Sequence, residues 1–178
     1  GGGTNVLRVN TLNVGTGGRD RGSFSFAGAG GTLAISGISA GSRTALNIAT
    51  GDASTGGTGV TNIFDLSGHT ANLLLSDVNI GTQPRGSTSS AVFSFSDGTM
   101  DMNTLTMGVR GLNTSGNGAA SPRDTIVTMN LSGGTTVIQQ GILAMARVTG
   151  ATVSGQDVGK ERIANVTLNI TGNASVEV

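Results

Sequence analysis

The chain has 178 residues, of which 31 are Gly and 2 are Pro, and its ten basic and ten acidic side chains cancel to no net charge. A collagen needs Gly at every third position with abundant Pro, and a disordered chain has fewer apolar residues than the 36% found here. The sequence has no cluster of basic residues, which argues against nucleic-acid binding, and no Cys, which excludes thiolate metal sites. It also has no apolar run of about eighteen residues, which argues against membrane insertion.

Segments in which apolar and polar residues alternate recur along the chain and fall into three classes. The chain opens on a segment around Leu7 and continues to a segment that ends at Gly15. Segments of a further class, which we call strand A, end in Gly and occur at 23–28, 63–68, 92–98, 128–133 and 167–172. The type found around Leu7, strand B, follows each strand A, at 32–36, 72–76, 99–103, 136–139 and 175–178. The type that ends at Gly15, strand C, comes next, at 37–41, 77–81, 104–108 and 142–146.

The spacing of these segments is regular at two of the three corners. The first apolar residues of strands A and B lie 7 to 9 residues apart, and the step from strand B to strand C is 5 residues in four units. The step from strand C to the next strand A varies from 12 to 26 residues, in stretches rich in Gly, Ser, Thr and Asn that are typical of loops. We therefore expect long loops at one corner only, with residues 44–49 as an extra short strand inside the first long insertion.

Alternation with a period of two predicts strands with one buried and one solvated face, and no window has the apolar spacing of a helix. About three short strands per unit, in roughly five units, predict an all-β parallel β-solenoid, or β-helix, in which each coil stacks on the last. Residues 1–178 are expected to form one solenoid domain, as a segment of a longer chain or one subunit of a filament. Since the chain opens and closes on strand B, we expect its coils to continue in a longer chain or to stack end to end.

The predicted core consists of the inward-facing side chains of the three strand classes, and all five Phe fall on strand A. Burying a side chain of this size contributes roughly 1.5–3 kcal/mol. The residues expected to face inward are Phe24, Phe26, Phe64, Leu66, Phe93, Phe95, Met129, Leu131, Leu168 and Ile170 on strand A; Leu33, Ile35, Leu73, Leu75, Met100, Met102, Val137, Val176 and Val178 on strand B; and Leu12, Val14, Val78, Ile80, Leu105, Met107, Leu143 and Met145 on strand C.

Carboxylates are the first candidates for catalysis, because parallel β-helices include polysaccharide lyases and hydrolases. Asp97 and Asp101 flank the corner between strands A and B of one unit, and Asp65 and Asp77 lie one unit earlier. A glycosidase needs two carboxylates about 5–10 Å apart in a cleft. These residues occupy outward or corner positions, where Asp is usually solvated, so surface solvation is the preferred interpretation and catalysis the alternative.

Metal and cofactor sites have little support in the sequence. His69 is the only His, and without further ligands or a placed nucleophile it forms neither a metal cluster nor a catalytic triad. The Gly-rich stretches lack the phosphate-loop pattern and the calcium-binding repeat of β-rolls. We therefore expect no catalytic residue and no cofactor, and calcium is not required, although a single site at Asp52 or Asp124 stays open.

Four Asn residues lie between two apolar residues of a strand, at Asn13, Asn79, Asn130 and Asn169. In stacked coils such outward side chains come into register and can share amide hydrogen bonds, as Asn ladders do in cross-β assemblies. We interpret them as a structural feature that stiffens one face.

The unit FSFSDGTMDMNTLTMG, at 93–108, resembles the short β-strand repeats of very large bacterial surface proteins and autotransporter-type passengers. The match is good at 24–41 and 62–81 and weaker from Met129 onward, and it does not cover the long insertions. The resemblance implies an exported β-solenoid at the bacterial surface or outside the cell, with adhesive, stalk-like or fibre-forming roles. No catalytic residue is carried over from it.

The expected function is therefore structural: an extracellular fibre or adhesin segment built by coil stacking, without catalysis. Its expected partners are its own coils, from the same chain or from a second copy, together with cell-surface or glycan ligands. The alternative is a polysaccharide-processing or glycan-binding β-helix of the lyase type, which rests on the four Asp residues.

Overall fold

The computed structural model describes residues 3–16, 21–28, 30–50, 60–82, 89–110, 125–146 and 164–178. Within these ranges the chain forms eleven strands and no helix. The strands are β1 (Thr4–Arg8), β2 (Thr11–Val14), β3 (Ser23–Ser25), β4 (Thr32–Ser36), β5 (Thr44–Ile48), β6 (Val60–Ile80), β7 (Ser89–Arg110), β8 (Thr125–Leu131), β9 (Thr135–Ala146), β10 (Ala164–Ile170) and β11 (Ser175–Glu177).

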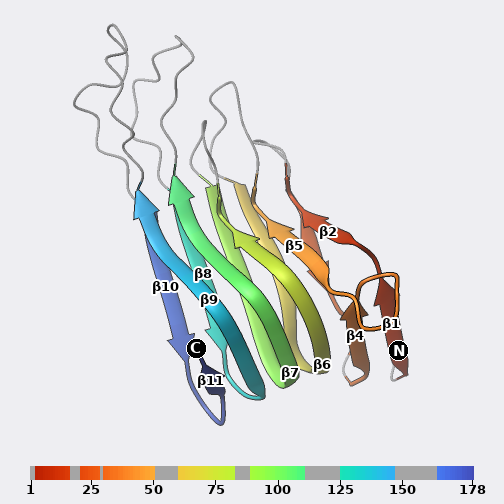
Figure 1. The fold of residues 1–178 in the computed structure, drawn as a ribbon. Coiled ribbons are helices and arrows are strands. Elements are labelled where there is room, and N and C mark those ends of the chain that lie inside the picture. The colour runs from red at the N-terminus through yellow and green to blue at the C-terminus, as the bar shows by residue number, and fades with distance from the viewer. Residues whose placement is uncertain are drawn as a thin grey trace, which may run out of the picture.

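Every pairing between these strands is parallel. We call one traverse of the chain through strand classes A, B and C a passage. Each strand pairs with the strand of its own class in the next passage: β1 with β4, β2 with β5, and β3 with β6. In Figure 1, strand C of successive passages forms one row through β2, β5, β6, β7 and β9. The prediction of an all-β chain with parallel strands is confirmed.

Strands β6 and β7 each pass through classes A, B and C as one continuous strand, of 21 and 22 residues. The pairing between them shifts register between Leu66 and Thr70, where strand A gives way to strand B. In Figure 1 the sheet turns over at this corner, so that β10, a strand A, runs opposite to β9, which carries strands B and C. The prediction of three separate short strands per unit is therefore wrong for these two passages, because the backbone bends here without leaving the sheet.

The core lies between strand A on one side and strands B and C on the other, and it follows the predicted alternation. All predicted core residues of β6 and β7 are buried: Phe64, Leu66, Leu73, Leu75, Val78, Ile80, Phe93, Phe95, Met100, Met102, Leu105 and Met107. Toward both ends of the sheet Leu12, Phe24, Phe26, Leu168 and Val176 are half-buried against this cluster. The side chain of Met145 lies outside the described residues.

Aromatic side chains stack on one another across successive passages. Phe64 lies between Phe24 and Phe93, with ring centroids 4.8 and 5.3 Å apart and interplanar angles of 9° and 6°. This separation follows from the spacing of about 4.8 Å between paired strands. Met129 and Leu168 continue the same row in β8 and β10.

The prediction that residues 37–41 form a strand C is wrong. Ile38 is 60% exposed and lies in the connection between β4 and β5. Strand C of this passage is β5, where Leu46 and Ile48 are buried and pair with Leu12 and Val14 of β2. The five-residue step points to Ile38, but an insertion between strands B and C moves the strand further along the chain. Variation in loop length is therefore not confined to one corner.

The prediction that Val137 faces the core is wrong by one residue. Thr136 and Ile138 are buried, and they pair with Met100 and Met102 of β7. Val137 pairs with Asp101 and therefore lies on the outer face. The register inherited from β7 decides the face of each side chain in β9, and a shift of one residue reverses all of them.

Predicted burial is also wrong at one edge of the sheet. Ile170 of β10 is 50% exposed, although Leu131, its partner in β8, is buried. Leu143 of β9 is 48% exposed, although it pairs with buried Met107. Both face inward by register, but no described strand pairs with them on their other side. Val178 follows β11 and is 84% exposed.

Candidate functional site

Three of the four candidate carboxylates accept a hydrogen bond from a hydroxyl or backbone N–H group. The Thr104 hydroxyl donates to Asp77 Oδ1 over 2.7 Å, and the Thr70 hydroxyl donates to Asp97 Oδ2 over 2.5 Å. Each of these bonds joins two adjacent passages, because Asp77 pairs with Thr104 and Asp97 pairs with Thr70. Asp65 Oδ1 accepts from the Ser67 backbone N–H over 2.9 Å.

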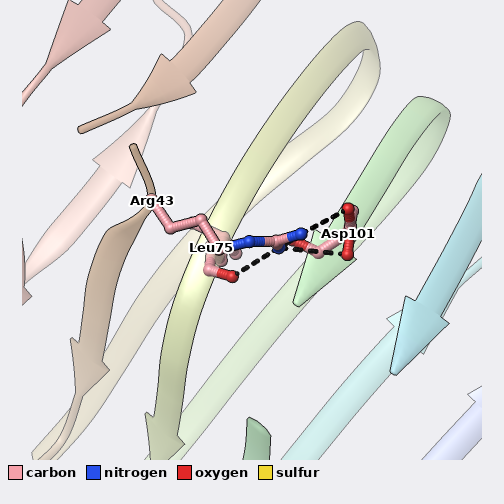
Figure 2. A network of polar contacts seen from close by, with 3 residues as sticks. All are labelled: Arg43, Leu75 and Asp101. Carbon is pink, nitrogen blue, oxygen red and sulfur yellow. Dashed lines mark hydrogen bonds and ion pairs between the residues drawn. The ribbon is translucent and has the colours of Figure 1, made fainter. Parts of the chain in front are cut away.

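The fourth carboxylate, Asp101, forms an ion pair with Arg43 (Figure 2). Arg43 Nη2 and Nη1 donate to the two carboxylate oxygens over 2.7 and 3.0 Å, and Nη1 also donates to the Leu75 carbonyl over 2.9 Å. Arg43 precedes β5, Leu75 belongs to β6 and Asp101 to β7, so one side chain joins three successive passages. The hydrogen bonds from Arg43 lower the pKa of Asp101 below its ordinary 3.8, and partial burial opposes this effect.

Two shallow grooves lie on the outer face of strands B and C. One, of about 260 Å³, is lined by Asp77, Asn79, Thr104, Leu105, Thr106, Gln140 and Ile142. The other, of about 540 Å³, is lined by outward side chains such as Asn72, Leu74, Thr99, Asp101, Thr135 and Gln139. Asp77 and Asp101 thus line different grooves, and neither Asp65 nor Asp97 lines either of them. The structure therefore does not bring the four carboxylates into one of these grooves.

His69 lies at the corner after strand A, where its imidazole stacks on the Phe26 ring with centroids 3.8 Å apart. Its Nδ1 atom is buried and has no hydrogen-bond partner among the described residues. His69 and Phe26 belong to adjacent passages, so the contact continues the aromatic stacking of strand A. The geometry indicates a packing role for this ring.

The predicted Asn ladders are confirmed. Asn47 Nδ2 donates to Asn13 Oδ1 over 2.9 Å, and Asn79 Nδ2 donates to Asn47 Oδ1 over 3.0 Å. On strand A, Asn169 Nδ2 donates to Asn130 Oδ1 over 2.8 Å. The sequence does not predict the middle member, Asn47, because the repeat spacing makes residues 44–49 an extra strand outside the repeat.

Two further polar residues were not found from the sequence. Asn62 is buried, and its Oδ1 accepts from the Gly22 backbone N–H over 2.7 Å. Arg43 lies in the insertion between β4 and β5, and no sequence spacing links it to Asp101. The only available signal is the polar character of Asn62 at an inward position immediately before strand A.

The described ranges hold no cluster of three or more His, Cys, Asp or Glu side chains suited to a metal ion. They also contain no helix long and apolar enough to cross a membrane. Asp52 and Asp124, the candidate positions for a single calcium site, lie outside the described residues.

Comparison with protein families, curated proteins and solved structures found no match to this chain.

Proposed function

We propose that the chain is a structural module without catalytic activity. In this proposal each passage is one coil of a β-solenoid, and the coils stack into a rod. The rod belongs to a bacterial fibre or adhesin at the cell surface or outside the cell. The location and the adhesive role rest on the resemblance of residues 93–108 to surface-protein repeats.

The repeated interface between passages carries the proposal. All ten pairings of the described strands are parallel and join strands of the same class. Stacked rings and Asn ladders cross the same interfaces. Such an interface depends on the pattern of one passage and not on how the passages are connected, so a further passage meets the same rows of side chains.

The polar side chains of the outer face support a role in stacking. Asp77, Asp97 and Asp101 each bond to a residue of another passage. A catalytic carboxylate pair would instead converge on a shared cleft with a perturbed general acid. These bonds add to the cohesion of the rod.

Electron microscopy of the purified chain and the mass of its native polypeptide test the proposal. We expect rods, formed within a native chain much heavier than 17.6 kDa or by association of copies of about that mass. Ile170→Lys, at the edge strand β10, should shorten rods made by association, because it places a charge in the apolar row. Ile126→Lys is the matched control, because Ile126 is similarly exposed but lies on the outer face of β8.

Compact monomers at every concentration, with a native mass near 17.6 kDa, would contradict the proposal. So would rods whose length responds equally to Ile170→Lys and to Ile126→Lys.

Glycan binding is the second candidate, supported by the two grooves on the outer face. Their linings supply hydroxyl, amide and carboxylate groups, which are the groups that bind sugar hydroxyls. The wild-type chain should then bind or cleave members of a panel of polysaccharides, and the double variant Asp77→Asn, Asp101→Asn should do so less. Equal behaviour of the two proteins would remove this candidate.

A further inference from the structure

The last residue of strand C adopts the same unusual backbone conformation in four passages. These residues directly follow Val14, Ile48, Ile80 and Met107, which pair with one another in register. They are Gly15, Ala49, Gly81 and Gly108, with φ of +63°, +52°, +64° and +64°. Among the described residues Ala49 is the only non-Gly residue with positive φ. This conformation favours Gly, so the presence of Ala in one passage calls for an explanation.

The three Gly residues each lie against a side chain near the start of a strand A. A Cβ atom at Gly15 would collide with the amide group of Asn62, and one at Gly108 would collide with Val166 Cγ2. One at Gly81 would collide with Val127 Cγ2 and lie 2.8 Å from Thr125 Cγ2. In each case the strand A concerned belongs to the passage two places further on.

The side chains met in this way occupy one register position. Asn62 pairs with Ala91, Ala91 with Val127, and Val127 with Val166. The same offset of two passages, applied to Ala49, leads to Ala91. Ala49 and Ala91 are both buried, and Ala91 has the smallest side chain of these four residues. The one Ala at the end of strand C is thus matched with the one Ala among these four strand A residues.

We propose that these pairs are a size-matched lock between strands C and A. A Gly at the end of strand C accommodates Val or Asn on strand A two passages later, and an Ala there accommodates only Ala. Strand pairing fixes the register within each class. The lock instead determines which strand A can pack against a given strand C, through the sizes of the two side chains that meet. It goes beyond the proposed structural role, because it specifies which residue at the end of strand C fits which residue on the strand A two passages later.

Thermal unfolding of Gly81→Ala, compared with Gly41→Ala, tests the lock. Gly41 also has positive φ, +72°, but a Cβ atom there would have no neighbour within 4 Å. Gly41→Ala should lower the melting temperature by about 2–4 °C through backbone strain alone. Gly81→Ala should lower it at least twice as much, because the added methyl group also overpacks Val127. In a Val127→Ala background the loss caused by Gly81→Ala should fall toward that of Gly41→Ala, and the excess that remains is the part due to Thr125 Cγ2.

The reverse exchange keeps the test decisive if Gly81→Ala does not fold. Ala91→Val should lower the melting temperature in the wild-type chain, and Ala49→Gly should restore most of that loss. Equal losses for Gly81→Ala and Gly41→Ala, or strictly additive effects in both pairs, would overturn the lock. Either result would leave the proposed structural function standing, since rods can form without size matching at this corner.

Discussion

Most side-chain hydrogen bonds on the outer face run from one passage to the next. Asn47 is bonded to Asn13 on one side and to Asn79 on the other, and Thr104 donates to Asp77. Each bond contributes little by itself, about 0.5–1.5 kcal/mol, because water competes for the same groups. Because each of these hydrogen bonds joins one passage to the next, all of them oppose separation of the passages.

Asp101→Asn is expected to lower the free energy of unfolding at pH 7 by about 0.2–1 kcal/mol, because it removes the ion pair with Arg43. The effect is small because the Asp101 side chain is 40% exposed. The pKa of Asp101 is lower in the folded chain than its ordinary 3.8, so the ion pair stabilises the fold above that pH. This contribution should disappear as the pH falls through the folded pKa. Urea unfolding of both proteins from pH 7 to pH 2 measures it.

Added salt is the control for the Asp101 prediction. At pH 7 and about 1 M salt the difference between the wild type and Asp101→Asn should shrink, because ions screen exposed charges. A difference that grows below pH 3.8, or that does not depend on pH, would show that Asp101 acts through something other than its charge.

Asn47→Ala is expected to lower the free energy of unfolding by about 1–2 kcal/mol, since it removes two amide hydrogen bonds from the centre of a ladder. Asn72→Ala is the matched control, because Asn72 accepts one bond, from the Thr99 hydroxyl, and is exposed. Urea unfolding should show a smaller loss for this control. Equal losses would mean that position within a ladder has no energetic consequence.

At the scale of the element, β9 shows that pairing with the preceding strand decides which side chains are buried. Val137→Thr should change the free energy of unfolding by less than about 0.5 kcal/mol, because the side chain lies on the outer face. Ile138→Thr should cost about 2–3 kcal/mol, because it removes apolar atoms from the core and buries a hydroxyl group. Thermal or urea unfolding measures both, and a larger loss for Val137→Thr would contradict the register of β9 on β7.

The sequence predicts an element well where its apolar alternation coincides with the spacing of the repeat. Strands β6 and β7 meet both conditions, and all their predicted core residues are buried. The repeat spacing predicts a strand C at Ile38, but the register of strand pairing shows that strand C of this passage is β5. At Val137 the alternation fits either face, because Thr136 is a polar residue in the core. Arg43 and Asp101 are 58 residues apart, and only the stacking of passages brings them together.

At the scale of the whole molecule, the passages behave as modules that contact mainly their neighbours. Contacts of this kind make stability close to a sum of passage and interface contributions. Removing one passage in register should therefore shorten the sheet without changing how the remaining passages pair. The size-matched lock adds one condition, because it joins strands two passages apart.

Deletion of residues 64–92 removes one passage in register, since Ile63 pairs with Val92 and Phe64 with Phe93. The fused strand keeps the inward and outward faces of its side chains. It also moves Val127 to the position opposite Ala49, so the deletion is best made together with Ala49→Gly. We expect a shorter chain that still unfolds cooperatively and keeps the far-ultraviolet circular dichroism of β-structure, at a lower melting temperature.

Deletion of residues 64–93, one residue more, is the matched control. Joining Ile63 to Ser94 reverses the face of every following side chain relative to the preceding strand, which would turn Phe95 outward unless a bulge absorbs the change. This control should lose cooperative unfolding or melt at a clearly lower temperature than the in-register deletion. If the two deletions are equally stable, the passages do not act as modules in fixed register. If the in-register deletion folds equally well with Ala or Gly at 49, the passages are modular and the size-matched lock does not restrict their exchange.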